Sequence, residues 1–371
     1  MQKTRVCIFC ESWESGGIES FLNNILLHMD LDNLEIDLVA ESIRESVFTA
    51  GLKEKGICFI ELSGKQRSFR NFALFQKLLR QRRYHIVHLN LFQGLSLCYA
   101  RIAKQEGIPV RIAHSHNTAL RKSAGRWLKL MIHRMGSHLF TNAATDLWAC
   151  SGEAAKFLFP SSVLRRKGYR YIPNGIQTGR FRFNAEIRAA IRTQLSAEDS
   201  FLIGNVGRLC YQKNQSFLLD IFHEVLQRKP ESKLLLVGEG EDEAALKQKA
   251  QQLGISDRVI FFGVTDQVEK LFFAMDAFVF PSRFEGLGIV SIEAQAAGLP
   301  VLCSENIPSE AHVTEWIKAS ALRDGPGAWA EQLFAIRPIS KREDAAQAVN
   351  EAGFDVTGVS ALIRKEYETN I

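Results

Sequence analysis

Two glutamates separated by seven residues, Glu285 and Glu293, bracket a glycine turn in the segment Phe284-Glu285-Gly286-Leu287-Gly288. The turn lies between a short apolar run and residues that recur at helical spacing, so it opens onto a helix N-terminus. Free backbone N–H groups and the positive end of the helix dipole make such a turn an anion site. The pattern fits a ligand with hydroxyl pairs at both ends and phosphates between them, as in a sugar nucleotide.

On this interpretation, Glu285 accepts hydrogen bonds from the sugar and Glu293 accepts them from the ribose diol. The backbone amides of Gly286, Leu287 and Gly288 hold the diphosphate between them. Spacing alone leaves an alternative open, which is an ordinary strand-to-helix loop. In that case the first glutamate is solvated and the second stabilises the first turn of the helix.

Two further groups follow predicted parallel strands, at the edge where open α/β sheets bind ligands. Gly16 and Gly17, in Ser-Gly-Gly-Ile-Glu-Ser, let a ligand approach the backbone closely, although a simple tight turn is the alternative. Their spacing is not G-x-G-x-x-G, which disfavours a dinucleotide site. His114 and His116 end a later strand in His-Ser-His-Asn, and no third ligand for a metal is apparent nearby.

Two cations, Arg208 and Lys213, follow a strand in the second half of the chain. Breaking a sugar–diphosphate bond places negative charge on the departing phosphate. An arginine fork and a lysine point charge are natural counter-ions for that charge. Two solvated surface cations are the alternative.

The elements that must position these groups alternate between strands and helices, which is the pattern of βαβ units and parallel sheets. The predicted strands of the first half are Arg5–Cys10, Leu34–Ala40, Ile57–Leu62, His85–Asn90, Val110–His114 and Asp146–Cys150. Its predicted helices are Gly17–Met29, Ser68–Arg83, Gly94–Gln105 and Arg121–Ser137. The predicted strands of the second half are Phe201–Val206, Lys233–Gly238, Arg258–Phe262, Ala277–Phe280 and Pro300–Cys303. Its predicted helices are Gln215–Leu226, Asp242–Leu253 and Asp266–Phe273.

The length of 371 residues suggests two domains of ordinary size. We expect an N-terminal Rossmann-like domain at 1–176, a polar linker at 177–198, a second Rossmann-like domain at 199–345 and a C-terminal segment at 346–371. The expected fold class is α/β, with two doubly wound domains that face each other across a cleft.

The paired glutamates inside Phe-Glu-Gly-Leu-Gly resemble the motif of family 4 glycosyltransferases, which have the two-Rossmann-domain architecture called GT-B. Gly16 and Gly17 resemble the glycine pair with which these enzymes approach the donor from the N-terminal domain. Arg208 and Lys213 resemble the pair that binds the leaving diphosphate. The resemblance also implies that the helix at Phe354–Tyr367 returns to the N-terminal domain.

The histidine motif is similar to that of the branch that builds capsules and exopolysaccharides, where a histidine at the position of His116 lies beside the reacting sugar. The turn Asn174-Gly175-Ile176-Gln177 departs from the family's Asn-Gly-(Val or Ile)-Asp, so no role is carried over to Gln177. The resemblance implies a retaining, metal-independent transferase without a cofactor. It would move a hexose-type sugar from a nucleotide diphosphate, with UDP the commonest in the family, to a glycan or lipid-linked glycan.

The predicted catalytic residues are Glu285, His116, Arg208 and Lys213. No general base stands out, which suits a front-side reaction in which the leaving phosphate takes the acceptor proton. Two rivals remain open at this point. A sugar-nucleotide epimerase on the same architecture would need no acceptor, and a non-catalytic sugar-nucleotide-binding subunit would bind the donor without turnover.

Charge is distributed unevenly, with +12 in residues 1–180 and −7 in residues 181–371, which sum to the net charge of +5. A basic half indicates an anionic partner. Cations alternate with aromatic and aliphatic residues in Ser63–Arg83 and Arg121–Arg134, which suits an interfacial helix on an anionic membrane. The alternative is that the apolar residues face the domain core. No nucleic-acid motif accompanies these segments.

No apolar run approaches the roughly 18 residues of a membrane span. We therefore expect a cytoplasmic protein that is peripheral at the inner face of the cell membrane. Two further motifs have features of metal sites, but both are disfavoured. Asp30-Leu31-Asp32 has the pattern of a metal motif but follows a helix, and the Cys7/Cys10 pair lacks a second pair for zinc.

Overall fold

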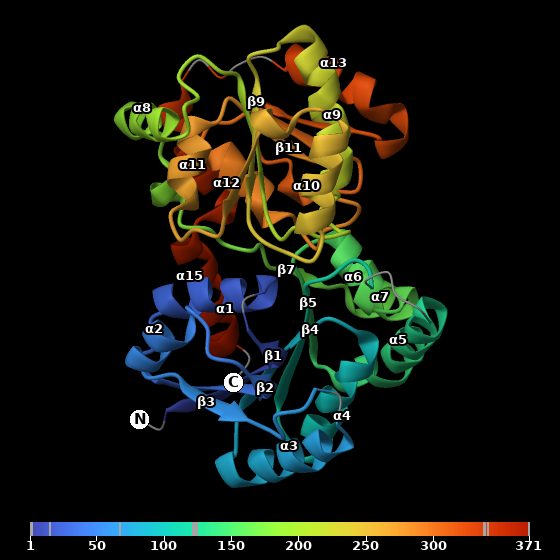
Figure 1. The fold of residues 1–371 in the computed structure, drawn as a ribbon. Coiled ribbons are helices and arrows are strands. Elements are labelled where there is room, and N and C mark those ends of the chain that lie inside the picture. Colours follow the sequence, from blue (N-terminus) through green and yellow to red (C-terminus); the bar gives the residue numbers. More distant parts are fainter. Residues whose placement is uncertain are drawn as a thin grey trace. The chain divides into compact units, whose positions relative to one another are not determined.

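The computed structural model describes residues 3–14, 16–66, 68–120, 125–336, 339 and 341–369. The chain forms two compact units (Figure 1). The first contains residues 1–175 and 355–371, and the second contains residues 176–354. Among the described residues, none of the helices combines the length and apolar character needed to cross a membrane.

The first unit is built on a seven-stranded sheet in the order β3-β2-β1-β4-β5-β6-β7, with every described pairing parallel. Its strands are β1 (Thr4–Trp13), β2 (Leu34–Ile43), β3 (Cys58–Glu61), β4 (Ile86–Leu91), β5 (Val110–Ser115), β6 (Asp146–Ala149) and β7 (Arg170–Tyr171). The direction of strand succession reverses between β1 and β4. Such a reversal opens a crevice at the carboxyl ends of the two strands, where doubly wound sheets bind ligands.

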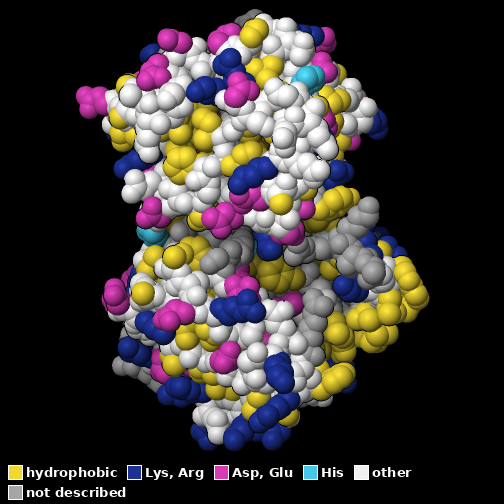
Figure 2. Space-filling model, viewed as in Figure 1, with side chains coloured by type: hydrophobic (Ala, Val, Ile, Leu, Met, Phe, Trp, Pro, Cys, Tyr) yellow, Lys and Arg dark blue, Asp and Glu magenta, His cyan; other side chains and the backbone are white. Residues whose placement is uncertain are grey.

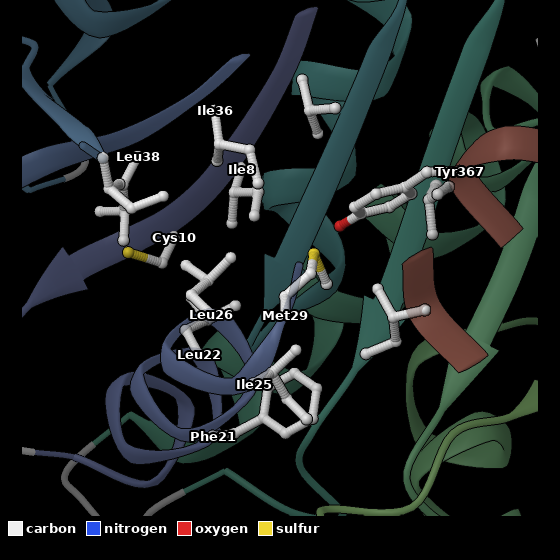
Figure 3. Close-up of a cluster of buried hydrophobic side chains, with 14 of the residues drawn as sticks. Ile8, Cys10, Phe21, Leu22, Ile25, Leu26, Met29, Ile36, Leu38 and Tyr367 are labelled. Carbon is white, nitrogen blue, oxygen red and sulfur yellow. The ribbon is translucent and has the colours of Figure 1, made fainter. Parts of the chain in front are cut away.

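The helices of the first unit are α1 (Gly17–His28), α2 (Thr49–Glu54), α3 (Phe69–Arg82), α4 (Cys98–Gln105), α5 (Arg126–Phe140), α6 (Gly152–Leu158), α7 (Ser161–Lys167) and α15 (Val356–Thr369). The last of these comes from the end of the chain and lies beside α1 (Figure 1). Its Val356, Val359, Ile363 and Tyr367 join the core that β1, β2 and α1 form (Figure 3). The C-terminal helix is therefore part of the hydrophobic core of the first unit.

The second unit repeats the design with a six-stranded parallel sheet in the order β10-β9-β8-β11-β12-β13. Its strands are β8 (Leu202–Val206), β9 (Lys233–Val237), β10 (Val259–Gly263), β11 (Ala277–Phe280), β12 (Val301–Ser304) and β13 (Ile317–Ser320). Its helices are α8 (Ala185–Gln194), α9 (Gln215–Arg228), α10 (Glu243–Gln252), α11 (Val268–Ala274), α12 (Ile289–Ala296), α13 (Gly325–Ala335) and α14 (Ala345–Val349). The succession of strands reverses between β8 and β11, which makes a second crevice of the same kind.

The predicted two-domain α/β fold is confirmed, and most predicted elements lie within a few residues of those observed. The expected linker at 177–198 is instead folded into the second unit. Its helix α8 is held by Arg188 and Arg192, which both form ion pairs with Asp276 just before β11. The expected tail at 346–371 also begins too early, because α14 packs against α12 and the chain leaves the second unit only after residue 354.

Candidate functional site

The glycine turn between β11 and α12 has the geometry that the sequence predicts. Gly288 is the N-cap of α12 and adopts a left-handed conformation with φ 86°. A Cβ at this position would lie 3.2 Å from the Phe280 ring, so both backbone angle and space favour glycine. Leu287 is buried beneath the turn. The first amides of α12 therefore stand beside a turn whose conformation is fixed by packing.

Glu285 and Lys213 come from different loops and form an ion pair, with 2.8 Å between Lys213 Nζ and Glu285 Oε1. Both side chains are largely buried, at 17% and 8% exposure for the lysine and the glutamate. The Lys213 ammonium also lies 4.9 Å from the centre of the Phe280 ring. One loop follows β8 and the other follows β11, so the pairing is a direct result of the strand reversal.

A neighbouring side chain, Gln212, holds the glutamate from the other side. Its Nε2 donates to Glu285 Oε2 at 3.3 Å and to the Phe284 carbonyl at 3.0 Å. Arg283 and Asn214 join the same two loops through a 2.7 Å hydrogen bond. Gln212 was not predicted from the sequence. Its position directly before Lys213 was the available signal, since it must follow the same strand.

Arg208 lies on the loop after β8, where the backbone is tightly packed. A Cβ at Gly238 would lie 2.3 Å from the Gly207 carbonyl oxygen, so these two loops touch through their backbones. The guanidinium is exposed and forms a 3.0 Å ion pair with Glu241, from the loop after β9. Gln215 fixes the backbone of Arg208 by donating to its carbonyl at 3.1 Å. The structure thus gives Arg208 a counter-ion that the sequence analysis had not paired with it.

Glu293 lies one helical turn into α12, in a partly buried position. Burial raises its pKa to about 7, while Arg180 and Lys213 lower the pKa and Glu269 raises it. Arg180 belongs to a 3₁₀ turn, Thr178–Phe181, and its guanidinium is 2.8 Å from Glu269. Glu293 is therefore poised between its two protonation states near neutral pH. Arg180 was missed by sequence reasoning, because nothing in its local pattern links it to α12.

In the first unit, Gly16 lies between β1 and α1, Gly17 is the first residue of α1, and Ser15 lies outside the described residues. Gly16 is the N-cap of α1, and a Cβ there would lie 2.5 Å from Glu19 Oε2. A Cβ at Gly17 would meet nothing within 4 Å. The two glycines therefore serve different needs, since the first accommodates a buried carboxylate and the second borders open space.

The carboxylate of Glu19 lies at this turn, with Oε1 accepting a hydrogen bond from the Glu14 amide at 3.4 Å. Burial raises the pKa of Glu19, and the amides of Glu19, Glu14 and Gly16 lower it. A carboxylate three residues after the N-cap that binds amides at the helix start supplies one half of a capping box, since the N-cap Gly16 has no side chain to supply the other half. Glu19 was not among the predicted site residues, although its place three residues after the N-cap was a recognisable signal.

His116 follows β5 and lies against the Phe21 ring of α1, with 5.0 Å between ring centres. Its Nε2 lies 2.9 Å from Asn90 Oδ1, at the end of β4. Burial lowers the pKa of His116 to about 3, so the ring is neutral at physiological pH. A neutral imidazole in this position can exchange hydrogen bonds with a hydroxyl group but carries no charge.

A chain of buried side chains runs from His114 to the C-terminal helix. His114 Nδ1 is 3.2 Å from His88 Nε2, and His88 Nδ1 is 2.7 Å from the Tyr367 hydroxyl. The rings of His114 and His116 lie 4.0 Å apart. Burial lowers the pKa of both His88 and His114. The chain links α15 to β5, the strand that His116 follows.

The two motifs disfavoured as metal sites, Asp30/Asp32 and Cys7/Cys10, have other surroundings in this fold. Asp30 forms an ion pair with Arg364 of α15, and its Oδ1 accepts the Asp32 amide at 2.9 Å, so it joins a turn to the C-terminal helix. Cys7 and Cys10 are buried, and burial raises the pKa of both thiols well above the usual value. Within the part of the chain that the structure describes, no three His, Cys, Asp or Glu side chains are grouped as a metal site.

Comparison with known proteins places this geometry in a family. Residues 15–180 match the model described as Glycosyltransferase Family 4, and residues 187–353 match that of Glycosyl transferases group 1. The chain belongs to the family 4 glycosyltransferases. The strand reversal between β8 and β11 and both glycine turns lie inside the matched regions of this glycosyltransferase, whereas β1 precedes the first of them.

Two similar proteins and one solved structure each span most of the chain. EpsF of Bacillus subtilis (strain 168), named as a glycosyltransferase, is 28% identical over 97% of this chain and 95% of its own. A UDP-Gal:alpha-D-GlcNAc-diphosphoundecaprenol alpha-1,3-galactosyltransferase of Escherichia coli is 25% identical over 64% of this chain and 62% of its own. The structure of HepE of Anabaena in complex with UDP has a TM-score of 0.80 at 19% identity, covering 99% of this chain and 100% of HepE. This last likeness shows that the fold is GT-B.

Proposed function

We propose that this glycosyltransferase moves a hexose-type sugar from a UDP-sugar to a glycan acceptor with retention of configuration. The observation that carries the proposal is the buried Lys213–Glu285 pair at the glycine turn of α12. A carboxylate and an ammonium held 2.8 Å apart can part to bind a sugar hydroxyl and a phosphate respectively. Solved complexes of HepE with UDP and with UDP-glucose, which share the fold, support UDP as the nucleotide.

Different residues are proposed to bind the sugar, the diphosphate and the ribose of the donor. Glu285 holds the sugar, the amides of Gly286, Leu287 and Gly288 hold the diphosphate, and Glu293 accepts from the ribose diol. Glu293 does this as a carboxylate, and its pKa of about 7 makes that contact dependent on pH. In the first unit, Gly17 borders open space, which suits contact with the donor diphosphate.

We propose that cationic side chains, rather than a metal or another cofactor, stabilise the charge that develops when the sugar–diphosphate bond breaks. The bond from the sugar's anomeric carbon to the diphosphate breaks, and a bond to the acceptor oxygen forms on the same face. The acceptor proton passes to the leaving phosphate oxygen, whose charge Arg208 and Lys213 stabilise. His116 is neutral and can position a hydroxyl of the reacting sugar, with Asn90 fixing its ring at 2.9 Å.

The acceptor is proposed to be a lipid-linked glycan in capsule or exopolysaccharide synthesis, at the inner face of the cell membrane. Support comes from the Escherichia coli relative, which is named for an acceptor that carries a diphosphoundecaprenol group. The cationic first half of the chain favours an anionic partner of this kind. Nucleic acid is not proposed as a partner.

A thermal-shift panel tests the donor assignment. UDP, GDP, ADP and their hexose conjugates are compared at equal concentration, since a ligand that binds the native state stabilises it in proportion to ln(1 + [L]/Kd). UDP and at least one UDP-hexose should raise Tm, and Glu293→Gln should reduce the rise. A larger rise with GDP or ADP compounds than with any UDP compound would contradict the assignment.

A further inference from the structure

We propose that the exposed face of α5 is the surface that docks this protein on an anionic lipid bilayer. Its large apolar side chains, which we call the α5 ridge, are Trp127, Leu128, Met131, Met135 and Leu139. They are 43–72% exposed. Figure 2 shows apolar side chains gathered over the region where Figure 1 places α5. Four of the five recur every fourth residue, so they form one continuous ridge along the helix.

The opposite face of α5 shows why this ridge does not serve the core. The residues that α5 buries are His133, Gly136 and Ser137, which are small or polar. A Cβ at Gly136 would lie 2.6 Å from the backbone of Leu95, so α5 sits almost backbone to backbone on the 3₁₀ turn Gly94–Leu97. The helix is thus amphipathic with its apolar side outward. For the five ridge residues this excludes the alternative that they face the domain core, whereas Leu130, Ile132 and Phe140 of the same helix are half-buried.

The charge around the ridge favours an anionic occupant. Arg126, Lys129 and Arg134 are exposed on α5 itself, and the neighbouring α7 ends in Arg165, Arg166 and Lys167. Neither helix contains Asp or Glu. Cations placed beside Trp, Met and Leu are the composition of a helix that lies in the headgroup region of an anionic bilayer.

A groove beside the ridge adds a place for a headgroup. It has a volume of about 380 Å³ and is lined by Arg134, Phe157, Ser161 and Ser162, among others. A guanidinium and hydroxyl groups at the border of an apolar surface suit a lipid phosphate. A second copy of this chain is a poorer occupant, because a symmetric contact would bring the cations of two α5 helices together without any acid on α5 or α7.

The other segment predicted to meet the membrane has a different structure. In α3, Phe75, Leu78 and Leu79 are buried, and the cations are partly paired, as Arg80 is with Glu106 at 2.7 Å. Only Phe69 of its large apolar residues is strongly exposed, at 88%. Arg67, Arg121 and Lys122 lie outside the described residues. The lipid surface is therefore assigned to α5 and not to α3.

Co-sedimentation with phosphatidylcholine vesicles of rising phosphatidylglycerol content tests this surface. The full-length protein should bind anionic vesicles at low salt, and binding should fall at high salt, because exposed charges are screened. The triple variant Trp127→Ser, Met131→Gln, Met135→Gln should weaken binding by about tenfold or more, since it removes most of the inserted apolar area. The matched control Phe69→Ser, Val264→Ser changes two strongly exposed apolar residues elsewhere and should bind as wild type does.

A charge test uses residues that do not pack against the core. Arg126→Glu with Lys129→Glu should weaken vesicle binding by about tenfold or more, since each cation near an anionic surface contributes to binding. Lys318→Glu with Arg323→Glu makes the same change in net charge on exposed positions of the second unit and should leave binding unchanged. If both pairs of substitutions weakened vesicle binding equally, net charge rather than the position of the cations on α5 would control binding.

The α5 surface rests on the peripheral localisation proposed above. The thermal-shift response to UDP tests the donor site separately from this surface. Both α5 variants should keep the wild-type response to UDP, because the ridge lies outside the proposed donor residues. Absence of wild-type binding to anionic vesicles at low salt would overturn the α5 assignment and leave the donor assignment standing. Concentration-dependent dimerisation that the ridge variants abolish, without vesicle binding, would replace the bilayer with a second copy.

Discussion

Replacing Lys213 with methionine separates the structural and catalytic roles of the Lys213–Glu285 pair. The change leaves a carboxylate of 8% exposure without its ammonium, although Gln212 still donates to it at 3.3 Å. Removing one partner of a buried pair costs about 3 kcal/mol or more. In a unit of this size, that free energy corresponds to a fall in Tm of about 6–12 °C.

The double variant Lys213→Met, Glu285→Gln removes the uncompensated carboxylate as well. We expect it to recover at least half of the lost Tm, because replacing both charges avoids an unpaired buried ion. Activity should not recover. Loss of Lys213 alone should lower kcat on the order of 10²–10³-fold, as for other fixed charge stabilisers, and the double variant should be no better.

Thermal unfolding and the kcat of UDP release from a UDP-hexose are measured on wild type and on both variants, with Lys247→Met as the matched control. Lys247 forms a 2.6 Å pair with Glu243 on α10, and its side chain is 54% exposed. An exposed helical pair contributes only about 0.3–0.5 kcal/mol, so Tm and kcat should hardly change. A double variant that melts as low as Lys213→Met would refute the reasoning from a buried ion pair. Full kcat in Lys213→Met would refute the catalytic assignment.

The other predictions concern pH, the exposed cation and the first glycine turn. Because the pKa of Glu293 is raised to about 7, its carboxylate appears as the pH rises through that value, so UDP affinity measured by calorimetry should increase from about pH 6 to about pH 8. Glu293→Gln should remove that dependence, and a pH profile unchanged in the variant would argue against the ribose contact. Arg208→Ala should lower kcat on the order of 10²–10³-fold. UDP release by the wild-type protein should persist in excess chelator. Loss of wild-type activity in chelator, restored by magnesium, would contradict a metal-independent reaction. Gly16→Ala should lower Tm, since its Cβ would lie 2.5 Å from Glu19 Oε2, whereas Gly17→Ala should keep Tm and weaken donor binding; the reverse order of Tm values would contradict the roles assigned to the two glycines.

The sequence allowed most strands of the two sheets, though not the edge strands β7 and β13, and the loops that carry the proposed donor residues to be predicted, because these depend on local pattern. Apolar strands alternate with amphipathic helices, and ligand groups of a parallel sheet gather at its carboxyl edge. That rule places Lys213 and Glu285 at the same edge of the sheet, and the observed strand order, in which β8 and β11 are neighbours, brings the two side chains together. It does not reveal Glu241 beside Arg208, because that pairing depends on the conformation of a loop after a third strand.

Two features could not be predicted, for different physical reasons. Polar composition at 177–198 looked like a linker, yet the same composition belongs to an exposed helix that Arg188 and Arg192 anchor to Asp276. The segments around α3 and α5 share a pattern of cations among apolar residues, and only packing separates them. The close approach of Gly136 to Leu95 turns the small side of α5 inward, and no periodicity in the sequence records that contact.

The most direct test of glycosyl transfer is release of UDP from UDP-glucose, UDP-galactose and UDP-N-acetylglucosamine, with and without undecaprenyl-diphosphate-linked N-acetylglucosamine. The account predicts that, for at least one donor, this acceptor accelerates UDP release, that the glycolipid gains the sugar in the same anomeric configuration, and that Glu285→Gln abolishes the acceleration. Donor consumption that is equal with and without the glycolipid, with an altered free sugar as product, would contradict transfer and indicate an epimerase. Saturable UDP-sugar binding without turnover of any donor would contradict catalysis altogether.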